Sequence, residues 1–200
     1  MKALHHLITA TLIFGFSQAS NANLITNSTF DTDLGGWTVE AATTTGVTWV
    51  AGEARVGQSG TPGTARFSQM FDIAADTKKL EVGFDYAWWI NAPVIEDTLS
   101  VELGYQTSVG MLFTTILTEG SNSASFQTVA SPSLLIGLTD LVDAPNNGTI
   151  RFILDETNTS AGTRIHLDNV VVEAVPEPSV LALMGLGLLG CGWIRRKQLV

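Results

Sequence analysis

The sequence predicts an all-β domain, an antiparallel β-sandwich made of many short strands. Large apolar side chains alternate with small or polar ones over Leu80–Ile90, and the same period of two recurs over Leu99–Tyr105. This alternation is typical of strands that bury one face. Clusters of glycine, proline and asparagine separate such segments, as at Gly60–Gly63, and no long segment follows the helical period of 3.6. Two packed antiparallel sheets satisfy this pattern.

The predicted strands lie within residues 23–174, a length typical of one domain. Each strand has apolar positions on one face and turn-forming residues near its ends. The segments predicted as strands are Thr64–Ile73, Leu80–Ile90, Leu99–Tyr105, Met111–Thr118, Thr149–Leu154 and Ile165–Glu173. Only Ser133–Leu141 could instead form a short helix.

Residues 1–22 predict a signal peptide. Met1–His6 is weakly basic, Leu7–Phe16 is apolar, and Ser20 and Ala22 have the spacing that signal peptidase recognises. The alternative is a retained N-terminal helix, but the apolar segment is too short to span a bilayer. We therefore expect signal peptidase to cut after Ala22 and the chain to be exported.

Residues 175–200 predict a membrane segment. They contain, in order, Pro176-Glu177-Pro178, the uncharged segment Ser179–Ile194 and the basic cluster Arg195-Arg196-Lys197. Proline lacks a backbone donor and ends an incoming strand. At about 1.5 Å per residue the apolar helix would be roughly 24 Å long, somewhat short of a hydrocarbon core of ~30 Å. Basic residues stay on the cytoplasmic side, so we expect a transmembrane helix with a cytoplasmic C-terminus.

This C-terminal segment resembles the PEP-CTERM sorting signal of bacterial surface proteins. The resemblance rests on Pro176, Glu177 and Pro178, the glycine-rich apolar helix, and the basic Arg195, Arg196 and Lys197. It implies anchoring in the inner membrane, processing by exosortase near the Pro-Glu-Pro motif, and a bacterium that makes extracellular polysaccharide. A plain C-terminal membrane anchor is the alternative. A glycolipid-anchor signal fits less well, because such signals end in an apolar tail.

The charge of the domain excludes some partners. Residues 23–174 contain six basic and eighteen acidic residues, a net charge of −12. Such a surface repels nucleic acid and anionic lipid and favours solubility. The single cysteine, Cys191, lies in the C-terminal segment, so we expect a domain without a disulfide. A domain of this size can bury enough surface to fold without one.

The two ends of the domain carry a second resemblance. Asn23–Asp31, followed by Gly36 and Trp37, is similar to the opening strand of galactose-binding-like jelly-roll modules, and Ile165–Val172 is similar to their closing strand. In such modules the first and last strands often meet at a structural calcium site.

The second resemblance also implies two metal ligands. Asp31 and Asp168 occupy the matching positions in the two strands. Calcium takes carboxylate and carbonyl oxygens, so a structural calcium ion is expected at these residues. The alternative is that Asp31 is solvated and Asp168 begins a turn or bulge.

Many modules of this fold bind glycans through aromatic side chains. Trp88 and Trp89 are adjacent, so in a strand they point to opposite faces. Trp88 continues the apolar face and is predicted to lie in the core, which leaves Trp89 available to stack on a sugar ring. Trp49 and Tyr105 are further candidates, and Trp37 is predicted to be structural. Core packing is the alternative for each of them.

The sequence gives little support for an enzyme. The domain has one histidine, His166, and no cysteine, which excludes a Cys-His pair and a three-histidine metal site. No nucleophile elbow, zinc-protease motif or phosphate-binding glycine loop occurs. Carboxylate pairs are available, but those near strand ends are predicted to be solvated loop charges. These are Glu96, Asp97, Asp155 and Glu156.

We therefore expect a non-catalytic protein of the cell surface or extracellular matrix. Its role would be structural or interactive and linked to extracellular polysaccharide. The first alternative is a carbohydrate-binding module with structural calcium, and the second is a glycan hydrolase. Exosortase and signal peptidase are the expected processing enzymes, and nucleic acid is not an expected partner.

Overall fold

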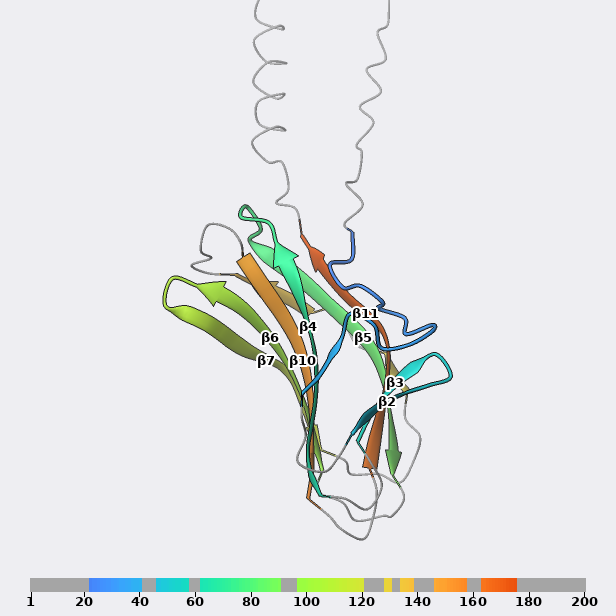
Figure 1. The fold of residues 1–200 in the computed structure, drawn as a ribbon. Coiled ribbons are helices and arrows are strands. Elements are labelled where there is room, and N and C mark those ends of the chain that lie inside the picture. Colours follow the sequence, from blue (N-terminus) through green and yellow to red (C-terminus); the bar gives the residue numbers. More distant parts are fainter. Residues whose placement is uncertain are drawn as a thin grey trace, which may run out of the picture.

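A computed structural model describes the domain and leaves out most of both flanking segments (Figure 1). The described residues are 22–40, 46–57, 62–90, 97–120, 128–130, 134–138, 146–157 and 163–175. The predicted signal peptide up to residue 21 and the predicted transmembrane helix after Val175 lie outside these ranges. None of the described residues belongs to a long apolar helix of the kind that spans a membrane.

The described strands form two antiparallel sheets, here called sheet A and sheet B. Sheet A has the order β1 (Thr38–Glu40), β4 (Gly63–Ile73), β10 (Asn146–Glu156), β6 (Thr98–Thr107) and β7 (Gly110–Gly120). Sheet B has the order β2 (Val47–Val50), β3 (Glu53–Val56), β11 (Thr163–Ala174), β5 (Lys79–Ile90) and β8 (Thr128–Ala130). The short β9 (Leu134–Gly137) also pairs with β5. The two sheets pack face to face as a sandwich (Figure 1).

The predicted all-β sandwich and its six longer strands are confirmed, and most of these strands extend beyond the predicted bounds. The possible helix at Ser133–Leu141 is not formed by the described residues of this segment, because Leu134–Gly137 is a strand. Leu80 and Val82 of β5 pair with Ile136 and Leu134 there. The open edge of β5 supplies backbone partners that an isolated segment lacks, so tertiary pairing decides the local structure. The short β1, β2, β3 and β8 were not predicted.

Aromatic rings join the two sheets at the centre of the core. Trp37 stacks on Phe67 of β4 with ring centroids 4.6 Å apart, and Phe30 packs against both rings. Phe84 of β5 meets Phe152 of β10 edge to face at 5.2 Å. Edge-to-face and offset pairs add to the stabilisation that area burial provides. Phe67, Phe152 and Phe30 are fully buried, and Trp37 is structural as expected.

The first segment of the domain closes against the last strand. The side chain of Asn23 donates to the carbonyl of Val170 at 2.9 Å and accepts from the amide of Val172 at 3.0 Å. Backbone bonds follow from Leu24 to Val172 and from Val170 to Ser28. These groups flank a bulge in β11 between Asp168 and Val171. The side chain of Asn23 therefore forms hydrogen bonds with backbone groups of β11 beside the bulge.

The domain begins and ends at the same end of the sandwich. The amide of Val175 donates to the carbonyl of Lys79 at 2.9 Å, so backbone pairing continues to Val175. Figure 1 shows the first described residues and the end of β11 at that end, while β10 ends and β11 begins at the other. The last described residue, Val175, therefore lies at an end of the sandwich and not on the face of either sheet.

The two adjacent tryptophans of β5 face opposite ways, as predicted. Trp88 is 4% exposed and packs in the core. Trp89 is half-buried on the outer face of sheet B, where the guanidinium of Arg164 lies 4.5 Å from its ring centroid.

Replacing these two residues should separate their roles. Trp88→Ala removes a core ring and should destabilise the protein by about 3–5 kcal/mol. Trp89→Ala removes a contact with a surface cation and should cost about 1 kcal/mol or less. Urea unfolding of both variants and the wild type measures the difference. Equal losses of stability would contradict this assignment of faces.

Candidate functional site

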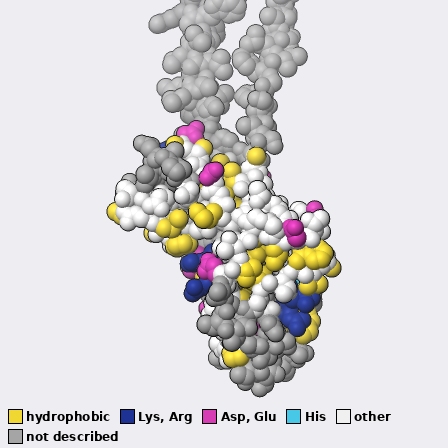
Figure 2. All heavy atoms as spheres, in the orientation of Figure 1, with side chains coloured by type: hydrophobic (Ala, Val, Ile, Leu, Met, Phe, Trp, Pro, Cys, Tyr) yellow, Lys and Arg dark blue, Asp and Glu magenta, His cyan; other side chains and the backbone are white. Residues whose placement is uncertain are grey.

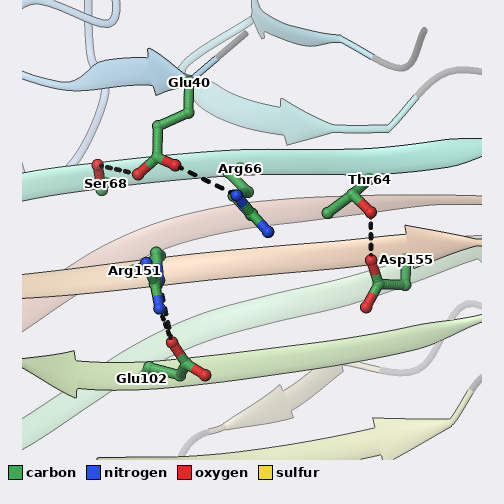
Figure 3. A network of polar contacts seen from close by, with 7 residues as sticks. All are labelled: Glu40, Thr64, Arg66, Ser68, Glu102, Arg151 and Asp155. Atoms are coloured by element: carbon green, nitrogen blue, oxygen red, sulfur yellow. Dashed lines mark hydrogen bonds and ion pairs between the residues drawn. The ribbon is translucent and has the colours of Figure 1, made fainter. Parts of the chain in front are cut away.

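The outer face of sheet A carries paired charges (Figure 3). Arg151 of β10 forms an ion pair with Glu102 of β6, in which Nε lies 2.9 Å from Oε2 and Nη2 also contacts that oxygen. Both side chains are more than three quarters buried. They sit directly opposite each other in the β10–β6 register. Cross-strand pairing therefore holds this guanidinium and carboxylate in one orientation.

Three further polar contacts lie on the same face, nearer the edge and the end of the sheet. Arg66 approaches Glu40 at 3.9 Å, and the hydroxyl of Ser68 donates to the same carboxylate at 3.3 Å. Thr64 donates to Asp155 at 2.6 Å (Figure 3). These contacts are more exposed than the Arg151–Glu102 pair, so they contribute little to stability. They do make most of this face polar.

An apolar strip crosses the same face beside the Arg151–Glu102 pair. Met70 is 66% exposed, Phe113 40% and Met111 37%. In the strand register, Met70 of β4 lies opposite Thr149 of β10, which in turn lies opposite Gly104 of β6. Gly104 lies opposite Phe113 of β7. Figure 2 shows hydrophobic side chains beside charges of both signs over β6, β7 and β10.

Gly104 makes room for the ring of Phe113. A Cβ atom at Gly104 would lie 2.6 Å from Cε1 of Phe113 and 2.7 Å from Cγ2 of Thr149. The phenyl ring therefore lies over the glycine, close to the sheet. The guanidinium of Arg151 sits 4.2 Å from the ring centroid. An aromatic ring and an ion pair are thus held side by side on an exposed surface.

Such a surface suits a polyhydroxylated ligand. An aromatic ring offers area for the apolar face of a sugar ring, while a guanidinium donates to hydroxyl oxygens and a carboxylate accepts from hydroxyl protons. Sequence reasoning missed Phe113, Arg151 and Glu102. The opposite charges on the solvent-facing positions of two predicted strands were a signal, but the sequence did not show that these strands are neighbours.

The other predicted aromatic sites are placed differently. Tyr105 is 3% exposed in the core, so its prediction as a stacking residue is wrong, because it shares the inward alternation of Leu103. Trp49 is 40% exposed, and its indole N–H donates to the carbonyl of Phe30 at 2.6 Å. Trp89 lies on the outer face of sheet B, far from Phe113 in the topology. Its glycan contact stays a prediction.

The structure brings the two predicted calcium ligands into one acidic group. Asp168 is half-buried and Asp31 is exposed. Burial raises the pKa of Asp168 above its ordinary 3.8, and the charges of Asp85, Glu53 and Asp31 raise it further, while the amide of Asn169 lowers it. Among the described residues, no three or more acidic, histidine or cysteine side chains are arranged to hold a metal ion. A metal here would need other oxygen donors as well.

Two acids predicted to be solvated are buried instead. Asp97 is 1% exposed and Glu156 is 5% exposed. The prediction was wrong for both, because each continues the inward alternation of its strand into the space between the sheets. Asp155 points outward and is exposed, as expected, and Glu96 lies outside the described residues.

Residues 174–197 match the PEP-CTERM protein-sorting motif. The chain carries a PEP-CTERM sorting signal. This signal implies an exported, membrane-anchored protein of the cell surface that exosortase processes, and it implies a transmembrane segment. No curated protein matches the chain in sequence.

Solved structures match the domain in fold. The structure of TmCBM61 in complex with β-1,4-galactotriose has a TM-score of 0.50 and 12% identity, over 77% of this chain and 99% of that one. The N-terminal cellulose-binding domain of Cellulomonas fimi β-1,4-glucanase C has a TM-score of 0.44 and 18% identity, over 78% of this chain and all of that one. The carbohydrate-binding module TmCBM27 has a TM-score of 0.42 and 12% identity, with 78% and 97% covered. The PEP-CTERM protein thus has a β-sandwich fold like that of TmCBM61.

The raised pKa of Asp168 predicts a pH-dependent stability. A carboxyl whose pKa is higher in the folded state favours folding while it is protonated, and that contribution is lost as the pH rises through the folded pKa. In the presence of a chelator, Asp168→Asn should match the wild type at a pH below about 3.8. It should become the more stable of the two as the pH rises toward neutrality.

Thermal unfolding across this pH range measures the effect, with Asp72→Asn on the other sheet as the control for removing one exposed acid. If the difference in melting temperature between Asp168→Asn and the wild type does not increase with pH, the pKa of Asp168 is not raised in the folded protein and this prediction is wrong.

Proposed function

We propose that this PEP-CTERM protein is exported and binds extracellular polysaccharide through the outer face of sheet A. Signal peptidase would remove residues 1–22. The C-terminal helix would hold the protein in the inner membrane with Arg195, Arg196 and Lys197 in the cytoplasm, until exosortase cuts near Pro176–Pro178. The protein would then act at the cell surface or in the extracellular matrix.

The arrangement of Phe113 with the Arg151–Glu102 pair carries this proposal. The ring is 40% exposed on the outer face of the sheet, and the guanidinium of Arg151, which cross-strand register holds in its ion pair, lies over the ring. Preorganised polar groups next to an aromatic surface lower the cost of ordering on binding. Met70 and Met111 extend the apolar surface on either side. Together these side chains could contact more than one sugar ring of a chain.

The position of the chain ends supports the same proposal. Val175, the described residue before Pro176, lies at an end of the sandwich and not on a sheet face. This position suits a protein that would bind a ligand on a sheet face while it is anchored. The net charge of −12 on residues 23–174 disfavours acidic polysaccharides. Neutral glycans are therefore the expected ligands. The fold likeness to TmCBM61, a protein solved with β-1,4-galactotriose, is consistent with this class.

Substitution of the ring tests the site. Phe113→Ala should weaken binding to a neutral glycan by about 1–1.5 kcal/mol, roughly tenfold, because a stacking surface is lost. Trp89→Ala, which removes an aromatic ring from the outer face of sheet B, is the competing variant. It should weaken binding only if Trp89, as predicted from the sequence, and not Phe113 is the stacking residue. A glycan array with the full-length protein in detergent identifies a ligand, and calorimetry then measures the affinities.

The outcomes separate the possible sites. Loss of binding in Trp89→Ala with full binding in Phe113→Ala would move the site to sheet B. An array without any bound glycan would leave a structural surface protein as the better description. We propose a non-catalytic role in either case, since the domain has a single histidine and no cysteine. Release of reducing sugars from a bound glycan would instead indicate a hydrolase.

We also propose that calcium is a structural ligand near Asp168. The charges of Asp85, Glu53 and Asp31 act on Asp168 there. Asn169 bridges two of these carboxylates, with bonds of 2.8 Å to Asp85 and 3.3 Å to Asp168. A cation would relieve the repulsion, and backbone carbonyls near the bulge could complete its oxygen ligands. The ion would join the first segment to the last strand, where Asn23 already links them.

Removal of calcium tests this second proposal. Binding to the folded state alone adds about 2.7 kcal/mol when free calcium is 100 times its dissociation constant. The melting temperature of the full-length protein should therefore fall on addition of a chelator. Asp168→Asn should lose most of this response, whereas Asp72→Asn should keep it. Identical melting of the wild type with calcium and with chelator rules the ion out.

A further inference from the structure

Two acidic side chains lie between the sheets at the end of the sandwich opposite the chain ends. Asp97 precedes β6 and is 1% exposed, and Glu156 ends β10 and is 5% exposed. Both strands have these residues at the end where β11 begins (Figure 1). Carboxylates are rarely buried to this degree without a specific role, because desolvation opposes their charge.

The strand register places the two carboxylates opposite each other. The pairing of β10 with β6 ends at Asp155 and Thr98, and its continuation by one residue places Glu156 opposite Asp97. Both point inward, like the fully buried Leu99 two residues from Asp97. Side chains opposed in this way have Cβ atoms only about 4.5–5.5 Å apart, and like charges there destabilise the sheet. The arrangement therefore favours a positive ligand.

The hydroxyl of Thr163 adds an oxygen from the other sheet. Thr163 begins β11, is completely buried, and faces inward like Ile165. Its Oγ1 has no hydrogen-bond partner within the described part of the chain. A buried hydroxyl without a partner is costly unless a ligand satisfies it.

Gly57 shows how close these groups come. A Cβ atom at this position would lie 2.3 Å from Oε1 of Glu156 and 2.7 Å from the carbonyl oxygen of Thr163. Gly57 also has a φ of 100°, which side chains rarely adopt. The glycine therefore leaves space in which Glu156 reaches from sheet A to Thr163 on sheet B.

Asp97 is held in a defined orientation. Its Oδ1 accepts from the amide of Thr157 at 2.7 Å and from the hydroxyl of the same residue at 3.2 Å. These bonds tie the start of β6 to the end of β10. The carboxylate is thus positioned before any ligand arrives, which lowers the cost of binding.

We propose that Asp97, Glu156 and Thr163 bind a calcium ion between the two sheets. The donors are carboxylate and hydroxyl oxygens without nitrogen or sulfur, which suits a hard cation rather than zinc or copper. Two carboxylates correspond to the weaker extracellular calcium sites, with dissociation constants of roughly 0.1–1 mM. The ion would tie β6 and β10 to β11. This site is separate from the one proposed at Asp168 and rests on neither earlier proposal.

Calcium binding to the full-length protein in detergent tests the site. Equilibrium dialysis with calcium counts the ions bound per chain, and thermal unfolding in calcium and in EGTA measures their effect. Asp97→Asn and Glu156→Gln should each lose one bound ion. In EGTA these variants should melt higher than the wild type, because the repulsion between opposed carboxylates is removed, and calcium should raise their melting temperature by less than it raises that of the wild type.

Two more variants make the result decisive. Thr163→Val keeps the shape and both carboxylates and should weaken calcium binding by at least roughly tenfold, as the loss even of an outer partner does in metal sites. If the Asp97→Asn and Glu156→Gln variants do not fold, calcium binding by Thr163→Val alone tests the proposed site. Asp168→Asn is the control and should keep the ion bound at Asp97. The proposal is overturned if Thr163→Val and the acid variants bind calcium like the wild type, or if Asp168→Asn alone abolishes all binding.

Discussion

The burial of one face of each sheet constrains the long strands β4, β5, β6, β10 and β11. A side chain points either into the space between the sheets or out to solvent, and its neighbour in the strand takes the opposite direction. This constraint places Trp88 in the core and Trp89 outside it. It also places Glu156 between the sheets and its neighbour Asp155 outside. The chemistry of each face follows from this alternation.

The outer faces and the interior carry different polar chemistry. On the outer face of sheet A, the ion pair of Arg151 and Glu102 is balanced in charge and is supported by Phe113. Between the sheets, Asp97 and Glu156 are two negative groups in a desolvated space. The Arg151–Glu102 pair has no net charge, so it is stable without a ligand and can form hydrogen bonds with neutral hydroxyl groups. Two opposed carboxylates instead favour the binding of a cation. Glycan binding outside and cation binding inside are therefore compatible in one domain.

The closure of the domain links its fold to its sorting. Asn23 bonds to β11 beside the bulge, and Val175, which already belongs to the sorting motif matched at residues 174–197, is still paired with Lys79. The backbone pairing of the domain thus continues up to the residue before Pro176. Cleavage within that signal would leave these bonds intact, since they all lie on the N-terminal side of Pro176.

The sequence by itself determined the sorting signal, the all-β class, the longer strands and the opposite faces of Trp88 and Trp89. These depend on local composition and on a period of two, which are readable along the chain. Tertiary structure alone decided that Leu134–Gly137 is a strand, that Tyr105 is buried, and that Phe113 meets Arg151 across β6. It also decided that Asp97 and Glu156 face each other. Each of these facts depends on which strands are neighbours and on the register in which they pair. Contacts between residues far apart in the chain determine both, and these contacts form only when the two sheets pack together.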